Sequence, residues 1–174
     1  EGRENMDFIE PGRINDRITL LGRPESCVQL LDGGDEAVLL GGSMSYVVPD
    51  ILDQVEQFEI DPKKIRKLVI LHAHFDHCGA IPGLKKHWPW AQIVGSKRAQ
   101  ELLATTRVSN SISVMDAMAA ARFDRAELVK ERGCEFTKID VEKTLADGDE
   151  LPCGDLTMKI LAVPGHSSCS IAVY

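Results

Sequence analysis

The amino-acid sequence predicts a single layered α/β domain. Short apolar segments of strand type alternate along the chain with segments whose apolar residues have helical spacing. The length of 174 residues suits one domain, spanning residues 1–174. Hydrophobic residues make up 44% of the chain, which is enough for one sizeable core, and aromatic residues only 5%, so we expect that core to be mainly aliphatic.

The N-terminal part is expected to form β-hairpins followed by a helix. Residues 17–21 and 26–31 have strand-type composition, and residues 37–40 return from the turn at 32–35 as a hairpin partner. Pro49 is suited to the first turn of a helix. The apolar residues that follow it at helical spacing are Ile51, Leu52, Val55 and Phe58.

The remainder alternates between helices and strands. The continuous apolar run 68–71 predicts a strand buried on both faces, and residues 91–94 predict another. Residues 79–87 are expected to form a short helix. Residues 96–132 have a helical pattern with a polar break near 105–111, and we expect the Met115 and Met118 side chains to pack in the core rather than to face a substrate. Late strands are predicted at 136–139, 156–161 and 170–174.

Charge and cysteine content narrow the range of partners and compartments. The net charge of -7 and the pI of about 5.2 disfavour nucleic acid, because an acidic surface repels phosphate. No run approaches the ~18 apolar residues of a membrane span, and residues 1–5 show no apolar signal-peptide core. The five cysteines are odd in number and form no CxxC pair, which favours reduced thiols. We therefore expect a cytoplasmic protein that acts on a small molecule, without a nucleic-acid or membrane partner.

A dense cluster of potential metal ligands follows the predicted strand at 68–71. His72, His74, Asp76 and His77 bring three of the five histidines and a carboxylate into six residues. Alternate side chains of extended backbone share a face, so His72 and His74 can hold one ion, and a turn near Asp76 would bring Asp76 and His77 to a neighbouring position. Imidazole and carboxylate ligands together suit zinc, iron or manganese. Single histidines at strand ends are usually ordinary polar residues, but this density favours a metal site.

A second element lies in the Pro164–Ser168 segment. It also follows an apolar strand, and the Pro-Gly pair forces the chain into a sharp exit. His166 could complete a three-histidine site with His72 and His74. A lone loop histidine is usually structural, so this assignment depends on the upstream cluster.

Together these segments resemble the metallo-β-lactamase superfamily, through its HxHxDH signature at 72–77 and its Gly-His metal-ligand loop at 165–166. The resemblance implies an α/β (α+β) fold of the αββα sandwich type with the site at one edge of two sheets. It implies that His72, His74 and His166 hold a first metal and that Asp76 and His77 contribute to a second. Zinc, as one or two ions, is the implied cofactor, with iron or manganese as alternatives.

The chain departs from that family pattern in two places. The bridging Asp and the last His that the pattern places after the Gly-His loop are absent before Tyr174, so we expect the N-terminal portion of the fold, with an incomplete second sheet. An exposed C-terminal strand could then pair with a second copy in a homo-oligomer. Leu40-Gly41-Gly42 stands where the family often has an Asp that supports the site, and such support affects metal affinity.

The resemblance implies a metal-dependent hydrolase that uses a metal-bound hydroxide on a small ester, thioester or lactone, with Asp76 as the catalytic carboxylate that orients the nucleophile or binds the second metal. An iron-dependent redox enzyme on the same fold, similar to a persulfide dioxygenase or a diiron oxygen reductase, is an alternative. The diiron version is disfavoured because those enzymes usually have Glu at the position of His74. A non-catalytic fragment acting in assembly is a third possibility. Cys78 and Cys169 lie close enough to be ligands, but packing as small buried side chains is favoured.

Overall fold

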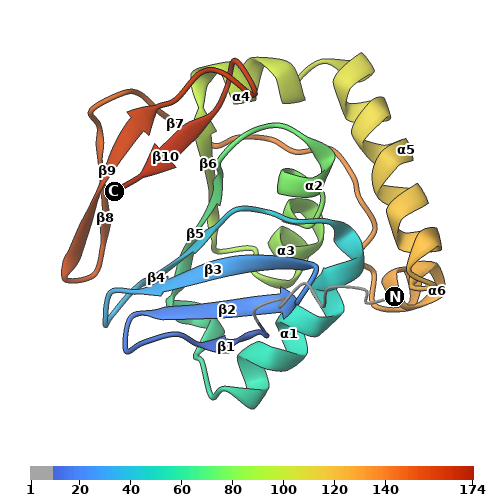
Figure 1. Cartoon of the computed structure of the whole chain (residues 1–174), viewed down its shortest axis with the longest axis horizontal. Helices are drawn as coiled ribbons and strands as arrows, with labels where there is room; N and C mark the ends of the chain where they lie inside the picture. The colour runs from blue at the N-terminus through green and yellow to red at the C-terminus, as the bar shows by residue number, and fades with distance from the viewer. Residues whose placement is uncertain (1–9) are drawn as a thin grey trace, which may run out of the picture.

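Two sheets and a layer of helices build the structure, a computed structural model that describes residues 10–174; the expectation for residues 1–5 lies outside this range. The larger sheet has seven strands in sequence order (Figure 1). These strands are β1 (Gly12–Arg13), β2 (Ile18–Arg23), β3 (Ser26–Asp32), β4 (Ala37–Leu40), β5 (Ile65–Ile70), β6 (Gln92–Ser96) and β7 (Lys143–Leu145). The smaller sheet has the order β10-β9-β8, formed by β8 (Glu150–Cys153), β9 (Leu156–Ala162) and β10 (Ile171–Val173).

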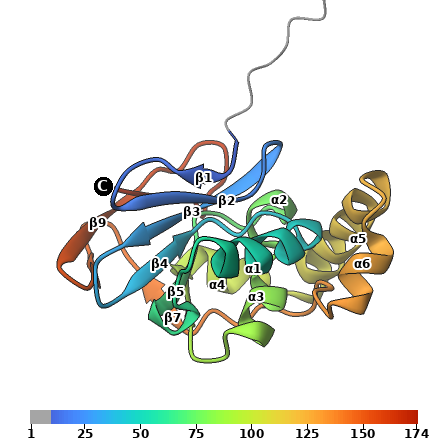
Figure 2. The ribbon, with the colours of Figure 1, turned by 90° about the horizontal axis from the view of Figure 1, so that it is seen from below.

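The larger sheet is antiparallel at its N-terminal end and parallel in its second half. Strands β1 to β4 pair in succession as antiparallel neighbours, whereas β4, β5, β6 and β7 run parallel. Parallel strands need crossover connections, and helices supply each of them. The connecting helices are α1 (Val48–Gln57), α2 (Phe75–Cys78), α3 (Ile81–His87), α4 (Lys97–Leu103), α5 (Thr106–Arg122) and α6 (Ala126–Glu131). Figure 2 shows the helices gathered on one side of the larger sheet.

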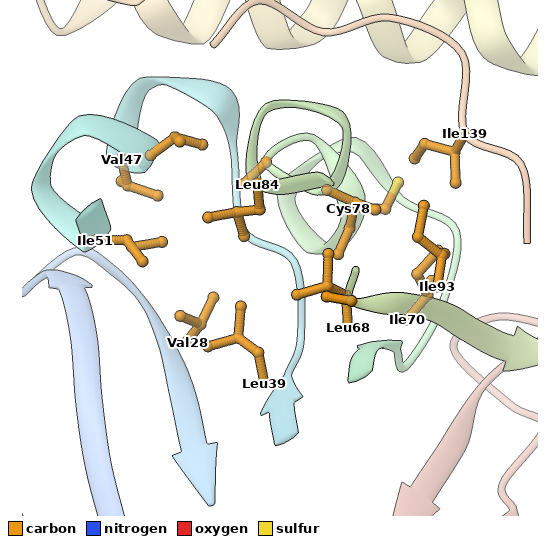
Figure 3. Close-up of a cluster of buried hydrophobic side chains, with 14 of the residues drawn as sticks. Val28, Leu39, Val47, Ile51, Leu68, Ile70, Cys78, Leu84, Ile93 and Ile139 are labelled. Atoms are coloured by element: carbon orange, nitrogen blue, oxygen red, sulfur yellow. The ribbon is translucent and has the colours of Figure 1, made fainter. Parts of the chain in front are cut away.

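Both faces of the larger sheet are buried, as the strand composition predicts. Leu39, Leu68 and Ile93 point toward the helices and form the main core with residues such as Ile51 and Leu84 (Figure 3). Alternation along each strand sends their neighbours to the opposite face. There the side chains that pack against the smaller sheet are Val38, Val69, Val94 and Leu145.

The layers are therefore helix, sheet and sheet, which is three layers of the predicted αββα sandwich. The outward-facing residues of β9, such as Lys159 and Leu161, are exposed, and within residues 10–174 no helix covers that face. The larger sheet thus carries a two-sided core, while the smaller sheet is buried on one face. In the described part of the chain, no helix is long and apolar enough to cross a membrane.

Two local predictions are wrong, and a third is right only in part. Residues 136–139 form no strand, because Ile139 enters the core on the helical side, where no strand edge offers pairing (Figure 3). The helical pattern does break near residue 105, between α4 and α5, but the break is shorter than predicted, since α5 begins at Thr106 and includes the rest of the polar stretch. Met115 and Met118 are 48% and 66% exposed, because α5 buries the row Ile112, Asp116 and Ala120 and the two methionines lie to one side of this row.

Candidate metal centre

The predicted ligands from residues 72–77 lie where β5 ends. Strand β5 ends at Ile70, the chain bends at Leu71 and His72, and His74, whose backbone is extended, occupies the N-cap position of the short helix α2. Asp76 lies in the first turn of that helix and His77 in its last turn. The abrupt change from strand to helix therefore presents all four side chains within a few residues, as the sequence suggests.

His166 arrives from the smaller sheet. It lies in the loop between β9 and β10, which extends toward α4 (Figure 1). The backbone N–H of Ile171 donates to the Leu71 carbonyl at 2.9 Å, which joins the start of β10 to the end of β5. The two ligand-bearing loops are thereby held side by side at the common edge of the two sheets.

Three of the five predicted ligands converge on one point. Ligand atoms of His72, His74 and His166 all lie within 4.8 Å of one another. The His166 Nε2 and His74 Nδ1 atoms are 3.0 Å apart. A tetrahedral ion with nitrogen ligands at about 2.0–2.1 Å would separate them by roughly 3.3 Å, so only small shifts are needed to seat an ion here.

The remaining two predicted ligands border this triad. The His77 ring lies against the His72 ring, with centroids 4.0 Å apart. The Asp76 carboxylate lies 3.6 Å from His77 Nε2, and both side chains are about half exposed. Asp76 and His77 therefore form a separate pair beside the triad.

His72 has the properties of a metal ligand. Only 9% of the residue is exposed, and its Nε2 atom has no hydrogen-bond partner in the described part of the chain. Such an unpaired buried polar atom costs free energy unless something else binds it. Burial, together with the neighbouring histidines, lowers the pKa of His72 to about 4, so the ring is neutral at pH 7. Neutral imidazole is the form that binds a divalent ion, so the donor set fits a divalent metal ion, zinc among others.

Cys169 connects the two ligand loops through sulfur and backbone contacts. The Ala73 N–H donates to Cys169 Sγ at 3.3 Å, and the Ser167 hydroxyl lies 3.0 Å from the same sulfur. The Ser96 hydroxyl donates to the Cys169 carbonyl at 2.7 Å and accepts from the Ala99 N–H at 3.1 Å, which caps α4. Cys169 is 1% exposed, so its side chain is buried in the contact between the two loops.

Cys78 is also buried, with its thiol donating to the His74 carbonyl at 3.0 Å. Burial raises the pKa of this thiol above its ordinary value, which disfavours the thiolate that a metal ligand would need. Cys78 and Cys169 are therefore both small buried side chains, as the sequence predicts.

Gly42 lies in the segment where the family often has an aspartate. A Cβ at Gly42 would lie 2.7 Å from the His77 carbonyl and from the Ile81 side chain. The Gly42 carbonyl instead accepts the Ala80 N–H at 2.8 Å. Backbone contact thus supports the segment that follows the ligands.

Sequence reasoning missed a buried carboxylate beneath α2. Asp116 of α5 is 2% exposed and accepts the Ser45 N–H at 2.8 Å. A Cβ built on Gly79, directly after α2, would lie 2.4 Å from Asp116 Oδ1. Burial raises the pKa of Asp116. One acidic residue in a helix gives no sequence signal, because its burial follows from the packing of α5 on residues far away in the chain.

Comparison with known proteins agrees with this geometry. A family model described as the metallo-beta-lactamase superfamily matches residues 23–174. The fold is similar to that of the subclass B3 metallo-beta-lactamase BJP-1 of Bradyrhizobium japonicum, with TM-score 0.70 and 24% identity over 94% of this chain and 55% of that one. It is also similar to that of the metallo-beta-lactamase GOB-18 from Elizabethkingia meningoseptica, with TM-score 0.73 and 22% identity over 95% of this chain and 55% of that one.

A beta-lactamase from Chitinophaga pinensis matches with TM-score 0.73 and 21% identity, over 99% of this chain and 59% of that one. The chain thus spans somewhat more than half the length of these solved structures. At these identities the structural matches show the fold alone, whereas the family model covers most of the chain. The chain belongs to the metallo-β-lactamase superfamily.

Proposed function

We propose that this chain carries the first metal position of a zinc-dependent hydrolase that acts on a small ester, thioester or lactone. The observation that carries the proposal is the convergence of His72, His74 and His166, with the buried Nε2 of His72 left without a partner. In the proposal these three side chains hold the ion. A bound zinc ion would supply Lewis acidity and lower the pKa of a coordinated water to about 7.

The residues of the chain would divide the remaining tasks. His72 is buried and neutral, so it anchors the ion at the base of the site, while the more exposed His74 and His166 leave the solvent side open to a substrate. Asp76 would accept hydrogen bonds from the attacking water and orient it, or hold a second ion together with His77. Cys169 and the Ile171–Leu71 hydrogen bond keep the His166 loop in place during turnover.

The test combines metal analysis with hydrolysis assays on the full-length protein. We expect hydrolysis of thioester or lactone substrates to disappear on chelation and to return with zinc. The His74→Ala variant should lose both tight zinc binding and hydrolysis. His87→Ala is the matched control, because His87 lies at the end of α3 and contacts the Arg132 carbonyl, away from the triad.

Hydrolysis that survives chelation or the His74→Ala change would contradict the proposal. Stoichiometric iron with consumption of oxygen would replace it with the redox alternative.

A further inference from the structure

An apolar groove begins at the candidate metal centre and runs along α5. Its first section has a volume of about 330 Å³ and is lined by residues of both ligand loops, including Ala73, His74 and Ser167. Leu102, Val108, Ile112 and Met115 supply apolar side chains to the same section. A molecule attached to a group at the metal centre could therefore extend directly into it.

Met115 also lines a second cavity, which we take as the next section of the groove. That section is more open, about 590 Å³, and is lined by Phe75, Met115, Met118, Ala119 and Arg122. Residues three and four positions apart share one face of a helix, so the α5 residues from Val108 to Ala119 form one continuous stripe. From Val108 to Met118 this stripe is about 15 Å long at 1.5 Å per residue.

The chemistry of the lining selects an aliphatic occupant. Few polar side chains lie along the stripe. An aliphatic occupant has no hydrogen-bonding groups, so it would lose no hydrogen bonds when it leaves water for this surface. Methionine is flexible and polarisable and adapts to chains of different shape. Helix α5 buries other residues in the core but leaves Met115 and Met118 exposed. Their apolar area in water is unfavourable unless a ligand covers it.

Charge around the groove adds a preference for anions. Arg107 lines the first section and Arg122 the second, while no acidic side chain lines either one. Within residues 10–174 neither arginine has an acidic ion-pair partner. A carboxylate on the occupant would be attracted and an ammonium group repelled.

We infer that the α5 groove binds the aliphatic acyl chain of the substrate, so that the hydrolase prefers medium- or long-chain acyl esters or thioesters, whose product is a fatty acid. This inference rests on the proposed function, because it takes the metal centre as the place of the scissile bond. It assigns Met115 and Met118 as specificity-determining residues that contact the chain.

The experiment measures binding of butanoate, hexanoate, octanoate and decanoate to the full-length protein freed of metal by a chelator, using isothermal titration calorimetry. Without metal there is no turnover, so the result is independent of the proposed hydrolysis. Because transfer of each methylene to an apolar site changes affinity up to about fourfold, we expect a gain of roughly twofold to fourfold per methylene in this half-open groove. Octylamine should bind at least tenfold more weakly than octanoate.

Two variants of α5 locate the effect. Met115→Gln should flatten the dependence on chain length, while Val114→Gln should leave it unchanged, since Val114 is 59% exposed and does not line either section of the groove. Equal affinity across the series, or the same loss in both variants, would overturn the inference. Absence of any binding would overturn it as well.

If chain-length dependence fails while zinc-dependent hydrolysis of short-chain substrates persists, the proposed function stands and the acyl groove does not. If the fatty acids bind as expected but hydrolysis does not depend on zinc, the proposed function fails instead.

Discussion

Replacing Ser96 by alanine should weaken both the fold and the metal centre, because one hydroxyl joins α4 to the His166 loop. That hydroxyl caps α4 through the Ala99 N–H and donates to the Cys169 carbonyl. Loss of an N-cap costs about 0.5–2 kcal/mol, and leaving a buried carbonyl unpaired costs about 1–3 kcal/mol. Since Ser96 is only partly buried and water can replace some of the contact, we expect a combined loss of about 2 kcal/mol.

The metal centre should respond to the same change. Cys169 lies three residues beyond His166 and contacts the loop that carries His74 through the Ala73 N–H. A shift of Cys169 would misplace His166. We therefore expect the zinc dissociation constant to rise about tenfold, as it does when residues that support metal ligands are lost.

Urea unfolding of the metal-free protein and zinc titration against a competing chelator measure the two effects separately. Ser96→Thr is the control, because threonine keeps the hydroxyl and should retain most of both properties. A Ser96→Ala variant with unchanged unfolding free energy and unchanged zinc affinity would refute the coupling between α4 and the ligand loop.

Three further predictions address α2 and its surroundings. Asp116→Asn keeps an acceptor for the Ser45 N–H but cannot ionise. Because the folded-state pKa of Asp116 is raised, the contribution of this residue to stability falls as pH rises from about 4 toward neutrality. The unfolding free energy, measured by urea unfolding across that range, should therefore fall less in the variant than in the parent protein. Identical pH profiles of the two proteins would contradict this. Gly79→Ala should lower the unfolding free energy by about 1–3 kcal/mol, because its Cβ would clash with Asp116. Gly165→Ala has open space for its Cβ and should change the unfolding free energy, measured by thermal unfolding, by no more than about 0.5 kcal/mol. Equal losses in the two variants would refute the packing argument. His77→Ala should keep one tightly bound zinc and lose any second one in metal analysis of the full-length protein, while loss of the first ion would show that His77 belongs to the triad's site.

Most of the strands could be predicted from the sequence because their burial pattern is local. Residues 68–71 form a continuous apolar run, and the structure buries that strand between two parallel neighbours. Residue type suggests that His166 could join His72 and His74, but nothing in either segment alone specifies which loops meet, and the family resemblance is what favours this assignment. Strand β8 (Glu150–Cys153) is not predicted from the sequence, because its pairing with β9 depends on register rather than on apolar content.

The roles of Ser96, Asp116 and Met115 could not be predicted, since each depends on the tertiary placement of the helices. Ser96 signals a helix cap in the sequence, but its second partner lies 73 residues away. Methionine is typical of a core, so the sequence favours burial of Met115. The orientation of α5 instead leaves Met115 48% exposed beside the metal centre. Hydrophobic spacing identifies a helix and its apolar residues, but it does not tell which of these residues the neighbouring elements cover.

The coordination of a single equivalent of zinc tests the central claim most directly. X-ray absorption of the zinc-loaded protein should show three imidazole ligands, and His166→Ala should lose one imidazole and bind zinc at least a hundredfold more weakly. Sulfur in the coordination shell, or a spectrum and affinity unchanged by His166→Ala, would contradict the claim that His72, His74 and His166 share one ion.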